Sequence, residues 1–83
     1  MVVEVQQRAY DEIVAFLAGG PKPEEILSFQ PSAETQERVR DLLERNRSGT
    51  LAEEEEAELD QYGHAEHLMR LLKAHVRRRL DLP

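Results

Sequence analysis

Residues 59–76 read LDQYGHAEHLMRLLKAHV, and this stretch decides the fold. Its apolar positions follow one another in steps of three and four, which is the spacing of one face of an α-helix. The face resembles a coiled-coil seam, and Leu68, Leu71 and Leu80 widen it to a surface that faces a core. The residues in these steps are Leu59, Tyr62, Ala65, Met69, Leu72 and Val76.

The helix extends outward from this stretch in both directions. Thr50 and Glu53 have the spacing of a capping box, in which each side chain bonds the other's backbone N–H. No proline follows before residue 80, so we predict one helix over about 51–80. Gly63 costs about 1 kcal/mol there relative to alanine. A bend or the close approach of another backbone would account for it, but the strong pattern on both sides favours a continuous helix.

A second helix, over about 33–45, precedes this one, and its Val39, Leu42 and Leu43 are expected to form a narrow apolar stripe. Ser32 is the expected N-cap, since its hydroxyl can accept a backbone N–H of the first turn. Asn46-Arg47-Ser48-Gly49 is typical of a turn. Because the connection is short, the helices over 33–45 and 51–80 are expected to form an antiparallel hairpin.

The N-terminal part predicts a helix over about 3–18 and one short helical turn from Pro23 to Ser28. Gly19-Gly20-Pro21 ends the first, and Pro31 stops the second. Val, Ile and Thr are too sparse for a sheet. The whole sequence, 1–83, is therefore expected to be a single all-α domain.

The predicted helix over 51–80 spans about 45 Å, while the one over 33–45 spans about 20 Å. The second half of the longer helix therefore projects beyond its hairpin partner with its apolar face uncovered. The N-terminal helix, about 24 Å long, can cover much of that face. The alternative is that a second chain covers it.

The composition of the chain limits how it can be stabilised and where it can act. The chain has 83 residues, no cysteine and a net charge of −6. A domain this small usually gains stability from disulfides, metal or association, and the lack of cysteine leaves a partner protein or a homo-oligomer. The longest apolar run, Ile13–Ala18, is too short to cross a membrane or to act as a signal peptide, so a cytoplasmic location is expected.

Charge is distributed unevenly along the chain. Residues 53–60 carry six acids and no base, and residues 70–79 carry five bases and no acid. The acids and bases complement the dipole of the predicted helix. Nucleic acid is the less favoured ligand, because the chain is acidic overall and no aromatic residues stand among the bases.

The one cluster with a catalytic appearance is His64-Ala65-Glu66-His67, one turn after Asp60. The metalloprotease motif needs its histidines four apart, and the deaminase motif needs two cysteines. We therefore expect no metal, no cofactor and no enzyme activity. The histidines are interpreted as solvated or partner-facing.

A family resemblance covers nearly the whole chain. It is carried by EILSFQPS at 25–32, ERV at 37–39, LLERN at 42–46, GTL at 49–51, EEEAELDQY at 54–62 and EHLMRLLKA at 66–74. The chain resembles a family of short, poorly characterised bacterial proteins, common in cyanobacteria and often encoded beside a small HNH-type nuclease or a toxin-like gene. It departs from that family at Gly63-His64-Ala65, where relatives tend to carry bulkier aliphatic residues.

The resemblance implies an antitoxin-like protein that neutralises or accompanies a nuclease. Two alternatives remain: a homo-oligomeric structural protein and a DNA-binding autoregulator. The second half of the long helix is the expected contact surface, as an amphipathic helix laid into a groove. The candidate partner-binding residues are Tyr62, Leu68, Met69, Arg70, Leu72, Lys73, Val76 and Arg77.

Overall fold

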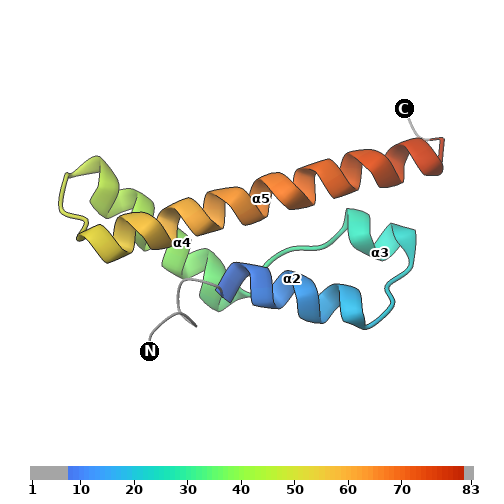
Figure 1. Ribbon diagram of the computed structural model, residues 1–83, viewed down its shortest axis with the longest axis horizontal. Helices are drawn as coiled ribbons and strands as arrows, with labels where there is room; N and C mark the ends of the chain where they lie inside the picture. Colours follow the sequence, from blue (N-terminus) through green and yellow to red (C-terminus); the bar gives the residue numbers. More distant parts are fainter. Residues whose placement is uncertain (1–7, 82–83) are drawn as a thin grey trace.

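A computed structural model describes residues 8–81, which form four helices and no strand. The predicted all-α fold is confirmed. The helices are α2 (Arg8–Ala18), α3 (Pro23–Leu27), α4 (Ala33–Arg47) and α5 (Glu53–Arg79) (Figure 1).

Helix α5 is the element against which all the others pack. It has 27 residues and lies along the longest axis of the molecule (Figure 1). Helices α2, α3 and α4 each contact it. Gly63 lies inside α5 without a break, so the expected continuity through this glycine is confirmed.

The antiparallel hairpin of α4 and α5 is present, with boundaries that differ from the prediction. Helix α4 ends at Arg47, two residues later than expected, and α5 covers Glu53–Arg79 instead of 51–80. Gly49 adopts φ +75° in the turn, a backbone conformation that glycine reaches without steric cost.

The predicted capping box of Thr50 and Glu53 is wrong. The Thr50 hydroxyl and backbone N–H both donate to the Arg45 carbonyl, at 3.2 and 2.9 Å, so Thr50 completes the end of α4. Helix α5 instead begins after Ala52, whose N–H donates to the Glu55 carboxylate at 3.0 Å. The run of consecutive glutamates supplied a suitable acid at the position that the real helix start requires.

The two N-terminal elements largely follow the prediction. Helix α2 ends at Ala18 as expected, while residues 3–7 of the predicted helix lie outside the described part. Helix α3 begins at Pro23, where the Lys22 N–H donates to the Glu25 carboxylate at 2.7 Å. Ser32 caps α4 as predicted, with its Oγ accepting the Thr35 N–H at 3.2 Å.

The core forms where α2 and α4 meet α5. Leu42 of α4 is completely buried at its centre. The core face of α5 contains Tyr62, Ala65, Met69 and Val76 as predicted, but the predicted widening by Leu68 and Leu71 is wrong, because these side chains are 44% and 50% exposed. Helices α2 and α3 cover the second half of this face, so the chain itself buries much of what the hairpin leaves open. The buried cluster consists of Ala9, Ile13, Leu42, Tyr62, Ala65 and Met69.

Candidate functional site: a groove beside helix α5

A buried carboxylate fixes α4 against α5 and positions the neighbouring core. Glu58 is 3% exposed and accepts two hydrogen bonds from the Arg38 guanidinium, both at 2.8 Å. The Tyr62 hydroxyl donates to it at 3.2 Å. The bonds from Arg38 hold the pKa of Glu58 below its ordinary value against the opposing effect of burial. Burial and the nearby Glu58 charge raise the pKa of Tyr62.

A second ion-pair cluster closes the hairpin near its turn. The Arg45 guanidinium donates to both Glu55 oxygens, at 2.9 and 2.7 Å, and to Asp41 at 3.1 Å. The bonds that Glu55 accepts from Arg45 and from the Ala52 N–H lower its pKa to about 2. This cluster of arginine and carboxylates has a structural role, because its charge-assisted hydrogen bonds join the consecutive helices α4 and α5.

A third polar cluster ties α2 to the start of α4. The Glu12 carboxylate accepts the backbone N–H and hydroxyl of Ser32, at 3.0 and 2.7 Å, and the hydroxyl of Thr35 at 2.7 Å. Burial acts to raise the pKa of Glu12, but these bonds outweigh it and the net shift is downward. Thr35 is 1% exposed, so the cluster fills a gap in the core with paired polar groups.

Acid is expected to unfold the protein through these three carboxylates. The pKa values of Glu12, Glu55 and Glu58 are all lowered in the folded state from an ordinary value of 4.5. A lowered folded pKa contributes stability above the unfolded pKa, and that stability is lost as pH falls through the folded value.

Above about pH 5, these three carboxylates should therefore cause little change in the melting temperature with pH. It should fall steeply between about pH 4.5 and about pH 2, the ordinary and folded pKa values of Glu55. Thermal unfolding followed by circular dichroism across this range measures the effect. Glu58→Gln should flatten part of the decline, and a curve equally steep in that variant would contradict the assignment to Glu58.

The structure divides the eight residues predicted to bind a partner. Tyr62, Met69 and Val76 are buried within the chain, and Leu72 packs partly buried against the core. Lys73 donates to the Phe29 carbonyl at 3.0 Å, and Arg70 pairs with Glu66 at 2.7 Å. Leu68 and Arg77 are exposed. Part of the predicted surface therefore belongs to the core of the chain itself, and part of it, including Leu68, is exposed.

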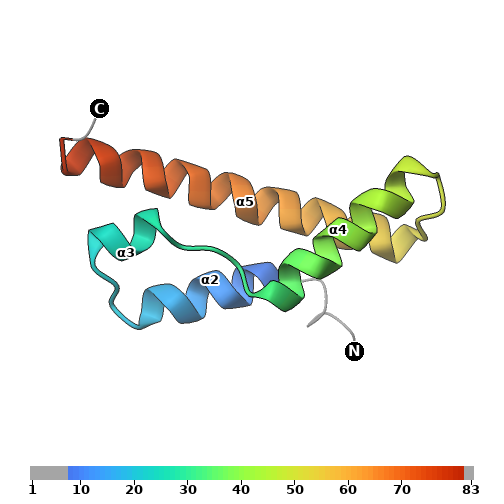
Figure 2. The same cartoon turned by 180° about the vertical axis from the view of Figure 1, so that it is seen from behind.

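An apolar groove of about 830 Å³ lies beside α5. Helix α5 forms one side of it, and α4 with the linker between α3 and α4 forms the other. Figure 2 shows α4 and this linker on the near side of the molecule. Buried core residues, among them Ile13 and Met69, form the floor. Phe29, Val39 and Leu43 lie opposite the α5 wall, and charges stand only at the rim. Those charged residues are Arg40, Glu66, Arg70 and Lys73.

Leu43 is the groove residue that the sequence reasoning assigned to the wrong environment. It was expected to share an apolar stripe with Val39 and Leu42, but it is 48% exposed while Leu42 is fully buried. Adjacent residues point about 100° apart on a helix, at 3.6 residues per turn. The Leu42-Leu43 pair is thus a sequence signal that one of the two faces away from the core.

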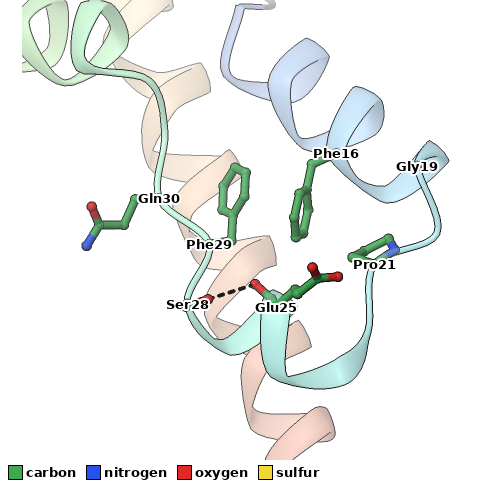
Figure 3. A pocket seen from close by; sticks show the side chains of 7 residues that line it. All are labelled: Phe16, Gly19, Pro21, Glu25, Ser28, Phe29 and Gln30. Carbon is green, nitrogen blue, oxygen red and sulfur yellow. Dashed lines mark hydrogen bonds between the residues drawn. The ribbon is translucent and has the colours of Figure 1, made fainter.

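A smaller hollow lies at the junction of α2 and α3 (Figure 3). Its volume is about 480 Å³, and its lining includes Phe16 and Phe29, whose rings pack against each other with centroids 4.7 Å apart and planes tilted by 42°. Its one carboxylate, that of Glu25, already accepts the Lys22 N–H. The Ser28 hydroxyl, which also lines it, donates to the Glu24 and Glu25 carbonyls at 3.4 and 3.2 Å, so these polar groups are already paired.

Neither histidine of the 64–67 cluster has a ligand set around it. Within residues 8–81, no three His, Cys, Asp or Glu side chains gather in a way that could hold a metal ion. No helix in that same range is both long enough and apolar enough to cross a bilayer. His64 and His67 are both exposed.

Comparison with known proteins found no relative of this chain. No protein-family model, curated protein or solved structure matches the chain.

Proposed function

We propose that this protein is a binding module, without chemistry of its own, that recognises another protein in the cytoplasm through the groove beside α5. The observation that carries the proposal is the open apolar groove, with Leu43 48% exposed at its edge. A groove with an apolar floor and a charged rim has the anatomy of a protein interface. An amphipathic helix of the partner would place its apolar face there.

The partner that we propose is a nuclease-type toxin encoded nearby, which makes this chain an antitoxin-like protein. The family resemblance supports that choice. Charge supports it as well, because Glu53, Glu54 and Glu56 are exposed at the start of α5. Such acids can complement the basic nucleic-acid-binding surface of a nuclease and speed association.

The test compares two substitutions at leucines of matched exposure on different faces. Leu43, at 48%, lines the groove, whereas Leu71, at 50%, does not. Leu43→Asp should weaken binding to the neighbouring gene product about 100-fold, because it places a carboxylate against the partner's apolar anchor. Leu71→Asp should bind like the unmodified protein.

Titration calorimetry with the purified neighbour product measures both affinities, and a nuclease assay reports neutralisation. Circular dichroism should show full helicity in both variants. Equal binding by the Leu43→Asp variant would remove the groove from the interface. No binding by the unmodified protein would overturn the proposed partner.

A further inference from the structure

One wall of the groove is a single row of α5 residues whose charge changes sign along its length. The row follows steps of four and three, so its members lie on one helix face. The same steps reach Glu56 before it and Arg77 after it, both exposed. The row therefore begins acidic and ends basic. Its members on the groove wall are Leu59, Gly63, Glu66, Arg70 and Lys73.

Most charged residues of α5 have no ion-pair partner within residues 8–81. The salt bridges of that range use Glu55, Glu58, Glu66 and Arg70 of this helix and none of its other charged residues. An opposite charge on another molecule can pair with those that remain. They are Glu53, Glu54, Glu56, Asp60, Lys73, Arg77, Arg78 and Arg79.

Gly63, near the middle of the row, lacks an explanation within the described chain. A Cβ built there would meet nothing within 4 Å, and alanine would favour the helix by about 1 kcal/mol. A glycine in a helix allows another backbone to approach closely. The missing side chain therefore leaves room for another helix to lie close to α5 at this position.

From these observations we infer that, in the isolated protein, α5 of a second copy of the chain occupies the groove and runs antiparallel to the first. Reversal of the row sets Glu56 opposite Arg77 of the second copy and Gly63 opposite Arg70. A parallel arrangement would set Glu56 against Glu56 and Arg77 against Arg77, which is repulsive. The sign change along α5 thus selects one orientation.

The two-fold axis of this pair falls at Glu66. Like charges would meet there, but each Glu66 carboxylate already pairs with Arg70 of its own chain at 2.7 Å. Leu59 faces the aliphatic stem of Lys73 from the second copy, while the ammonium of that lysine keeps its hydrogen bond to the Phe29 carbonyl of its own chain. Leu43 adds apolar area from α4 at the groove edge.

This inference rests on the proposed function in that both assign the groove to a protein helix. The second copy would hold the groove closed until the partner displaces it. Because self-association lowers the concentration of open groove, the apparent affinity for the partner should decrease as protein concentration rises.

The experiment is sedimentation equilibrium of the full chain over a range of concentrations. We expect a dimer with twice the 9.6 kDa mass of one chain. Gly63→Leu, Glu56→Arg and Arg77→Glu should each raise the dissociation constant by about tenfold or more, the first by blocking close approach and the others by turning two ion pairs into repulsions. Circular dichroism should show that each variant keeps its helicity.

The two charge variants and their mixture test the orientation together. In a parallel pair each single variant would leave the charge repulsion unchanged, and the mixture would bind more tightly than the unmodified protein. The Glu56→Arg chain carries arginine at both positions and the Arg77→Glu chain carries glutamate at both, so an antiparallel pair restores every ion pair in the heterodimer. Equimolar mixing should recover the unmodified dissociation constant. A chain that stays monomeric at its solubility limit, or a dimer unaffected by the three single variants and their mixture, would overturn the inference.

The same measurements separate this inference from the proposed function. A monomer that binds the nuclease-type partner, with loss of binding in Leu43→Asp, would overturn the homodimer and support the function. A dimer that dissociates in Gly63→Leu but never binds the neighbouring product would do the reverse.

Discussion

Met69→Asp is expected to unfold the chain, whereas Leu68→Asp, one residue earlier, should leave it folded. Met69 is 6% exposed on the core face of α5 and Leu68 is 44% exposed away from it. Removal of the methionine side chain together with burial of a carboxylate costs about 4 kcal/mol or more. A chain of 83 residues has a total stability of roughly 4–12 kcal/mol.

Leu68→Asp should cost about 0.5–1 kcal/mol, mainly in helix propensity. Urea unfolding followed by circular dichroism gives both free energies of unfolding. The pair is informative because the two substitutions introduce the same carboxylate into the same helix turn. Equal loss in the two variants would mean that another chain covers Leu68, and a stable Met69→Asp variant would contradict the core described above.

The second large effect is expected from Arg38→Met. Arg38 makes both charged hydrogen bonds to Glu58, which is 3% exposed. Its removal leaves a buried carboxylate with only the Tyr62 hydroxyl as donor. Loss of one member of a buried pair costs about 3–5 kcal/mol, and the partial exposure of Arg38 reduces this to about 2–3 kcal/mol.

The double variant Arg38→Met with Glu58→Gln provides the control. The neutral amide still accepts the Tyr62 hydroxyl but needs no cation, so most of the stability should return. Chemical unfolding of the two variants at pH 7 measures the recovery. A double variant as unstable as the single one would show that the contribution of Arg38 comes from its packing and not from its charge.

The course of α5 could be predicted from the sequence because six apolar residues, from Leu59 to Val76, follow one another strictly in steps of three and four. Its exact start could not, since Glu53 stands three residues after Thr50, a preferred N-cap, whereas the helix begins after Ala52, a residue that is disfavoured there. The choice depended on Thr50, whose hydroxyl bonds the Arg45 carbonyl. That contact exists only after the turn around Gly49 has formed, and it does not follow from spacing.

The groove was harder to predict than the helices. Periodicity identified a broad apolar face on α5, but it could not tell which part α2 and α3 would cover. Tyr62 and Met69 entered the core, while Leu59 and Gly63 became a wall. The opposite side depends on Phe29 and Leu43, which the chain brings to α5 through a linker whose path no local pattern encodes.

The dependence of every other helix on α5 has a consequence during protein synthesis. Helices α2, α3 and α4 all precede α5 in the chain, so the ribosome makes them before the surface that they cover exists. Translation of the 27 residues of α5 takes roughly 1–5 s at about 5–20 residues per second. During that interval Ile13 and Leu42 lack their final neighbours, and the nascent chain is open to chaperones and proteases until α5 has emerged.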